Sequence, residues 1–249
     1  MMNILWRNIK WRFENKFTII ITILQPLLWL VLYSAVAGST MKDTGITNYT
    51  AFILPGVMFL VTFSSCTSGG IMNFLMKSNG SFYRILISPV SRSSIVFAQM
   101  LESILVSFFE VTILYVVSIL FSVNINFGIL GIVFIAILIF LLAFFLSGLA
   151  YAISLCLPNE VVYETVMTAI VLPIFFLSSA LFPPENLSGG LAVAVKLNPF
   201  THVINALRSL IFREKIVFSE VLPVILLFVL MCCGSYALAM WRLKKETNV

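Results

Sequence analysis

Residues 73–92 read NFLMKSNGSFYRILISPVSR, a polar and basic segment between two long apolar blocks. We call this segment the basic island. Its first part, Lys77–Ser81, combines small polar residues with Gly80, which tolerates a positive φ, and this combination predicts a turn. The apolar blocks on either side are expected to be membrane spans. The chain would leave the membrane before the island and re-enter it from the same side afterwards.

The second part of the island predicts a short helix over Phe82–Ile87. Phe82, Ile85 and Leu86 follow the i, i+3, i+4 spacing of one helical face. Ser88-Pro89 should end this helix, because the residue before a proline is pushed out of the α region. Such a helix is either an interfacial loop whose arginines meet lipid phosphates, or a docking element that receives force from a cytoplasmic partner.

The composition indicates an integral membrane protein. Hydrophobic residues make up 61% of the 249-residue chain and charged residues only 10%, whereas a soluble domain is about 45–50% apolar and about 25% charged. The net charge of +5 does not indicate nucleic-acid binding, because the basic residues stand at the ends of apolar runs. The four cysteines lie inside apolar runs without metal or redox spacing and are interpreted as small hydrophobic residues.

The first 16 residues predict an amphipathic helix that lies in the membrane interface. Ile4, Leu5, Ile9 and Phe13 share one helical face, and four basic residues accompany them. The apolar run that follows, residues 17–37, has the length of roughly 20 residues that a membrane span needs. A signal peptide is the alternative, but its apolar region is shorter, about 7–15 residues.

Five further apolar runs predict five further spans, at about residues 51–72, 94–122, 128–157, 161–182 and 221–241. The expected fold is therefore an all-α integral membrane protein with six transmembrane helices, in one domain over residues 1–249. Pro55-Gly56 is expected to interrupt the second span near its start. The small residues at 64–70 either pack closely or line a polar path, and packing is the more frequent outcome.

Residues 185–219 predict a re-entrant helical hairpin between the fifth and sixth spans. Two helical candidates, 187–197 and 201–212, are joined by Asn198-Pro199, and neither is long enough to cross a bilayer. A broken helix is tolerated at membrane depth only where protein or water covers its backbone. His202, the single histidine, is more often a polar cap or an interface residue than a ligand.

Two carboxylates lie within the third span. Glu102 stands near its entry, at the expected depth of the headgroups, and Glu110 stands deeper. A carboxylate inside a span is a functional candidate, because a charge in hydrocarbon costs several kcal/mol. The alternative is a structural hydrogen bond to a neighbouring helix.

The distribution of basic residues predicts the orientation. With six spans both termini lie on one side, together with the basic island. That side holds ten of the fifteen Lys and Arg residues, namely Arg7, Lys10, Arg12, Lys16, Lys77, Arg84, Arg92, Arg242, Lys244 and Lys245. The positive-inside rule then places both termini and the island in the cytoplasm.

Four motifs in chain order resemble the permease subunit of type-2 ATP-binding-cassette (ABC) exporters, and the drug-export and nodulation-type branch is the most similar. Residues 49–56 are similar to that branch's Y-x-x-F-x-x-P-G, and residues 86–92 to its L-x-x-[ST]-P-x-x-R. Residues 172–187 resemble the end of its fifth span. Asn198–Thr201 with Ala206–Arg208 resembles its N-P-[LF]-[TS]…A-[LF]-R.

The resemblance implies that the island's helix is a coupling helix that sits in a groove of a cytoplasmic ATPase. Phe82, Ile85 and Leu86 would supply the buried contact and Arg84 a charged rim. The coupling residues expected in total are Phe82, Tyr83, Arg84, Ile85, Leu86, Pro89 and Arg92. The resemblance also implies an export path bounded chiefly by the second and fifth spans, with candidate residues Phe59, Thr62, Phe63, Phe175, Phe176 and Ser179. The outer hairpin would close this path, with Asn198, Pro199, His202 and Arg208 as its functional residues.

The implied protein is a transport subunit in a bacterial cytoplasmic membrane. Two permeases, identical or sibling, would pair with two ATPases that hold ATP and magnesium, and the substrate would be a hydrophobic or amphipathic drug, antibiotic or lipid-like molecule. The residues agree independently on one point, since the chain has no G-x-x-x-x-G-K-[ST] phosphate loop and no catalytic or metal cluster. The alternatives are export of a lipid-linked polysaccharide and a proton-coupled transporter that uses Glu102 or Glu110, although no inverted repeat favours the latter.

Overall fold

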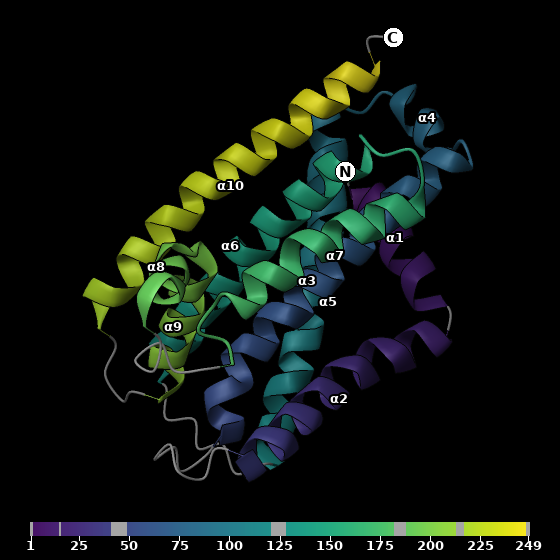
Figure 1. Ribbon diagram of the computed structural model, residues 1–249. Coiled ribbons are helices and arrows are strands. Elements are labelled where there is room, and N and C mark those ends of the chain that lie inside the picture. The colour runs from purple at the N-terminus through teal and green to yellow at the C-terminus, as the bar shows by residue number, and fades with distance from the viewer. Residues whose placement is uncertain are drawn as a thin grey trace.

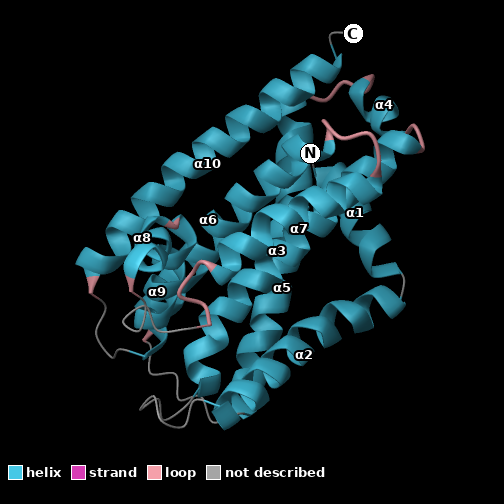
Figure 2. Ribbon diagram, viewed as in Figure 1, coloured by secondary structure: helices cyan, strands magenta, loops and turns pink. Residues whose placement is uncertain are grey.

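The computed structural model describes residues 2–14, 16–40, 49–120, 128–181, 188–212 and 217–247. Every regular element in these ranges is a helix (Figures 1 and 2). In chain order they are α1 (Met2–Glu14), α2 (Lys16–Thr40), α3 (Tyr49–Ser78), α4 (Ser81–Leu86), α5 (Arg92–Leu120), α6 (Ile129–Ser154), α7 (Glu160–Phe176), α8 (Gly189–Leu197), α9 (Pro199–Phe212) and α10 (Phe218–Thr247). The prediction of an all-α protein is confirmed for the described residues.

Four of these helices are long and apolar enough to cross a membrane. They cover residues 50–78, 92–119, 129–154 and 218–246, and they correspond to the second, third, fourth and sixth predicted spans. α2 occupies the place of the first predicted span, and α7, with 17 residues, that of the fifth. The count of six spans therefore stays a prediction for these two helices.

α3 is the central helix of the bundle, since it contacts α2, α5, α6, α7 and α9. Figure 1 shows α2 and α10 on opposite sides, with α3, α5 and α6 between them. Two glycines of α3 allow its neighbours to approach closely. A Cβ on Gly69 would lie 1.9 Å from Ser103 Oγ, and one on Gly70 would lie 2.0 Å from Tyr163 Oη. Close packing, rather than an open polar path, is thus what these two small residues provide.

Pro55 does not interrupt α3, so this detail of the second predicted span is wrong. The helix begins at Tyr49 and continues through Pro55 to Ser78. Gly56 has a packing role here, because a Cβ at this position would lie 2.8 Å from the Cβ of Ala180. The missing side chain lets the start of α3 approach the segment that follows α7.

α1 packs against α5 and α2 through a face that carries both apolar and polar side chains. Leu5 and Asn8 are buried while Trp6 is exposed, as expected for an amphipathic helix. Arg12 Nη1 donates to Glu102 Oε1 at 2.7 Å, and its Nη2 donates to Ser68 Oγ at 2.6 Å. Glu102 is 1% exposed. Its carboxylate is therefore held by an ion pair inside the protein.

The two ends of the chain and α4 lie at the same end of the bundle (Figure 1). A second hydrophobic cluster holds this end together, and it joins α4 to the ends of four longer helices through residues such as Met76, Ile95, Tyr151 and Leu243. Lys77 Nζ also forms an ion pair with Glu246 Oε1 at 2.6 Å, which links the end of α3 to the end of α10. This arrangement agrees with termini and basic island on one side of a membrane.

The pair between Arg12 and Glu102 generates a first prediction. Arg12→Ala leaves the Glu102 carboxylate buried and unpaired, and breaking a buried pair in this way costs about 3–5 kcal/mol. The double variant Arg12→Leu, Glu102→Leu removes both charges and is expected to be more stable than Arg12→Ala alone. Thermal unfolding of the purified protein measures the difference, with Lys10→Ala, an exposed position on the same helix, as the control. Equal stability of Arg12→Ala and the control would show that the pair contributes nothing.

Candidate functional site

The helix of the basic island has the local structure that its residues predict. Gly80 adopts a φ of 76°, in the left-handed region that glycine tolerates, and the side chain of Asn79 accepts a hydrogen bond from the backbone N–H of Ser81 at 3.1 Å. α4 then covers Ser81–Leu86, one residue earlier than predicted. After it, Ser88 Oγ donates to the carbonyl of Ile85 at 2.6 Å before the chain enters α5.

Two of the three α4 residues expected to contact an ATPase lie inside the permease itself. Phe82 is 1% exposed and Ile85 is 8% exposed, because both side chains are buried in the second hydrophobic cluster of the protein itself. They are not available to a groove of another protein in this structure. Tyr83 and Ile87, which are 50% and 86% exposed, and Arg84 form the outward surface. Leu86 is half-buried, and Pro89 and Arg92 are exposed.

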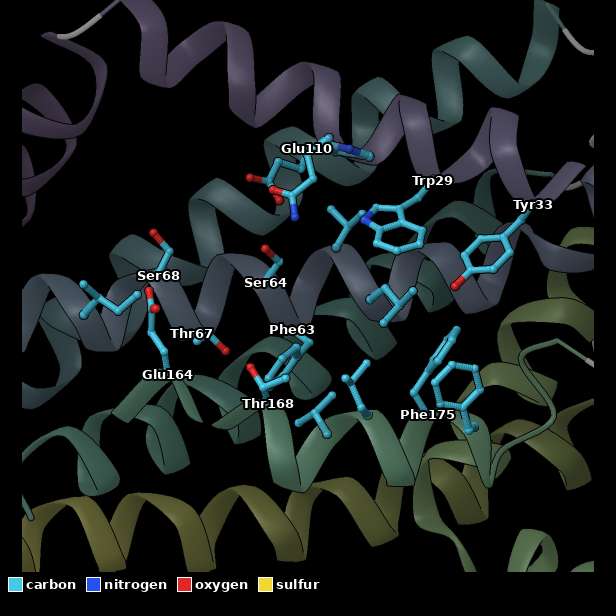
Figure 3. A pocket seen from close by; sticks show the side chains of 18 residues that line it. Trp29, Tyr33, Phe63, Ser64, Thr67, Ser68, Glu110, Glu164, Thr168 and Phe175 are labelled. Atoms are coloured by element: carbon cyan, nitrogen blue, oxygen red, sulfur yellow. The ribbon is translucent and has the colours of Figure 1, made fainter. Parts of the chain in front are cut away.

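A cavity of about 510 Å³ lies between α2, α3 and α7, and Glu110 of α5 also contributes to it (Figure 3). Its size falls within the range of roughly 300–1,000 Å³ that is usual for ligand pockets. The aromatic lining residues come from three helices and are Trp29, Tyr33, Phe63, Phe175 and Phe176. The polar lining residues are Gln25, Ser64, Thr67, Ser68, Glu110, Glu164 and Thr168.

Three of the six predicted path residues line this cavity, namely Phe63, Phe175 and Phe176. The other three are buried in the bundle and are not among its lining residues. Phe59 packs its ring 4.9 Å from that of Phe200, and Thr62 Oγ1 donates to the backbone of its own helix. Ser179 Oγ donates to Asn205 at 2.7 Å. These three therefore have packing or hydrogen-bonding roles in the structure.

The contribution of α2 to the cavity is not among the features predicted from the sequence. Trp29 and Tyr33 are four residues apart, on one face of the helix, and their rings stack at 5.3 Å. This i, i+4 aromatic pair inside an aliphatic run was a usable signal. Glu164 was also missed, although it lies one turn into α7 and faces Thr67 and Ser68 in Figure 3.

The two acids of α5 have different surroundings. Glu102 is paired with Arg12 and does not line the cavity. Glu110 lines it and is hydrogen-bonded to the hydroxyl of Ser65. Among the described residues, no group of three or more His, Cys, Asp or Glu side chains is placed to hold a metal ion.

The two short helices predicted between the fifth and sixth spans are present as α8 and α9, joined at Asn198. The side chain of Asn198 donates to the carbonyls of Ile174 and Leu177, each at 2.8 Å, and accepts from the backbone N–H of Phe200 at 3.0 Å. It thus caps the start of α9, where Pro199 holds the first helical position, and also satisfies carbonyls at the end of α7. His202 is exposed and Asn198 is the cap, so His202 does not cap this helix.

Arg208 joins α9 to two other elements. Its Nη2 donates to the carbonyl of Ser179 at 2.7 Å and its Nε to the carbonyl of Phe52 at 3.3 Å. The guanidinium also lies 3.9 Å from the centroid of the Phe52 ring. Its Nη1 also donates to Asn205 Oδ1 at 3.0 Å, so Arg208 contacts two backbone carbonyls, an amide side chain and an aromatic face. Asn198 and Arg208 are thus brought together with the segment after α7. Residues 185–187 and 213–216 of the predicted hairpin lie outside the described residues.

Comparison with known proteins agrees with this architecture, because residues 1–212 match the family described as ABC-2 type transporter. The chain belongs to this family. It is 28% identical over 211 residues to ycf38 of Cyanophora paradoxa, named as a transport permease, which covers 83% of this chain and 72% of the relative. It is also 22% identical over 189 residues to the daunorubicin resistance ABC transporter permease protein DrrB1 of Streptomyces coeruleorubidus. This match covers 76% of the present chain and 66% of the relative. The resemblance drawn from the four motifs is therefore confirmed, and the chain is an ABC-2 permease.

The contacts of Asn198 generate a second prediction. Asn198→Ala removes both donors and the cap, and each buried group left without a partner costs about 1–3 kcal/mol. Asn198→Asp is the matched variant, because it keeps the acceptor for Phe200 and loses the donors to Ile174 and Leu177. We expect both variants to be less stable than wild type in thermal unfolding, the Asp variant because its carboxylate oxygen faces the carbonyls of Ile174 and Leu177. An Asp variant as stable as wild type would show that the two carbonyls do not depend on this side chain.

Proposed function

We propose that this ABC-2 permease is the membrane subunit of an ATP-driven exporter, with α4 as the helix that receives force from a cytoplasmic ATPase. The observation that carries the proposal is the packing of α4: its inner face is buried among the ends of the spans, while Tyr83, Arg84 and Ile87 remain exposed. A force applied to the exposed face therefore reaches α3, α5, α6 and α10 through direct contacts.

The cavity supports a small hydrophobic or amphipathic substrate, such as a drug, an antibiotic or a lipid-like molecule. Its volume of about 510 Å³ suits such a molecule better than a lipid-linked polysaccharide. Exposed apolar residues of α2 and α7, among them Leu28, Leu32 and Leu172, flank it. They offer a surface to a second permease, identical or sibling, and two permeases would pair with two ATPases.

The transport cycle has two states. ATP and its magnesium ion, held by the ATPase pair, close that pair and draw the two α4 helices together, and the span bundles then change from an inward-facing to an outward-facing state. The substrate is moved only because it binds the two states with different affinity. In this cycle the outer hairpin α8–α9 closes the path on the outer side of the cell membrane, and both termini lie in the cytoplasm.

The exposed face of α4 generates a third prediction. Tyr83→Ala together with Ile87→Ala removes two large apolar contacts, each worth about 1.5–3 kcal/mol when buried at an interface, so ATPase affinity should fall at least about a hundredfold. Arg84→Ala should do less, because exposed ion pairs contribute about 0–1 kcal/mol. Co-purification of the ATPase with the permease measures the loss.

The control for this experiment is Ile129→Ala together with Leu130→Ala, an equally exposed apolar pair at the start of α6. This control should retain the ATPase. Phe82→Ala should instead lower the stability of the permease, since Phe82 is part of its core. If the Tyr83, Ile87 double variant retains the ATPase at the wild-type level, α4 is only an interfacial loop.

The orientation generates a fourth prediction. Single cysteines at Asn48 and Asn186, both outside the described residues, should react with an impermeant thiol reagent from outside the cell, and one at Asn79 should react only from inside. The background must lack the native cysteines, because Cys156 and Cys233 are exposed. External labelling at Asn79 would reverse the proposed orientation.

A further inference from the structure

We propose that the molecule carried by this permease is an amphipathic cation, bound in the cavity between α2, α3 and α7 with its charge toward Glu110 and Glu164. This inference rests on the proposed export function and names its substrate class.

The first argument is the charge of the cavity. Two carboxylates are among its lining residues, and no Lys, Arg or His is, although the chain as a whole has a net charge of +5. The nearby guanidinium of Arg12 is bound to Glu102 and Ser68, so that pair is neutral by itself. A ligand inside the cavity therefore meets acidic groups on α5 and α7.

The second argument is the distribution of side chains along the cavity. Figure 3 shows Trp29, Tyr33 and Phe175 toward one end, and Thr67, Ser68 and Glu164 toward the other, with Glu110 above Ser64 between them. Aromatic faces attract both planar apolar groups and cations. An apolar body with a positive charge at one end matches this order of side chains.

These features are less compatible with an entirely apolar occupant. A lipid tail or an apolar helix face in the cavity would leave the buried Glu110 without a counter-charge, which is costly in a low-dielectric surrounding. An anionic ligand would add repulsion to that cost. A cationic ligand supplies the counter-charge and is not repelled by the carboxylates.

The test uses two probes with the same shape and opposite charge, tetraphenylphosphonium and tetraphenylborate. Their binding to the purified full-length permease in detergent is measured by equilibrium dialysis, with empty micelles subtracted. We expect saturable binding of tetraphenylphosphonium and only micelle-level retention of tetraphenylborate.

Variants locate the charge selection. Glu110→Gln and Glu164→Gln each keep the shape of the side chain and remove its charge. Glu110→Gln should weaken tetraphenylphosphonium binding by roughly tenfold, because the Glu110 carboxylate is buried. Glu164→Gln should weaken it less, because Glu164 is exposed. Glu160→Gln is the matched control, because Glu160 lies one turn earlier on α7 and does not line the cavity. It should bind like wild type. Equal binding of both ions, no binding of either, or Gln variants with wild-type affinity would overturn the inference.

A second readout separates this inference from the export proposal. The Gln variants should still co-purify with the ATPase, since neither residue is on α4. Charge-selective binding by a wild-type permease that retains no ATPase would overturn the export mechanism and leave the cation site standing. Normal ATPase retention without charge-selective binding would overturn the cation site and leave the export mechanism standing.

Discussion

The structure depends on satisfying backbone carbonyls where helices end inside the bundle. α7 stops at Phe176, and the chain then turns through residues 177–181 while still packed against α3 and α9. Water is scarce in such a place, so each exposed carbonyl needs a partner from the protein. Asn198 supplies donors to two such carbonyls and Arg208 to that of Ser179, and these side chains are what allow a short seventh helix and a broken hairpin to coexist in one apolar fold.

The same two residues show what the sequence predicts and what it cannot predict. The hairpin itself was predictable, because two short helical patterns flank Asn198-Pro199 and neither can cross a bilayer. The partners of Arg208 were not predictable, because carbonyl groups carry no sequence signal. The cavity had the same limit: the aromatic pair of Trp29 and Tyr33 is visible in the sequence, but only the position of α2 beside α3 and α7 shows what these rings line.

Periodicity has a similar limit at α4. The spacing of Phe82, Ile85 and Leu86 correctly places apolar residues on one face, but the spacing does not say what covers that face. In the structure the ends of the spans cover it, with Met76, Met100 and Leu243 in the same cluster. Because its inner face is buried in this way, α4 is part of the bundle and cannot move independently of it. The small residues of α3 continue the same close packing toward the cavity.

Two ion pairs hold the end of the bundle that carries α4, and they differ in their contact with water. The side chains of Lys77 and Glu246 are 23% and 28% exposed, whereas those of Arg12 and Glu102 are 11% and 1% exposed. Salt weakens exposed ion pairs more than buried ones. Added salt is therefore expected to loosen the last turn of α10 beside α4 more than the contact between the N-terminal helix and the spans.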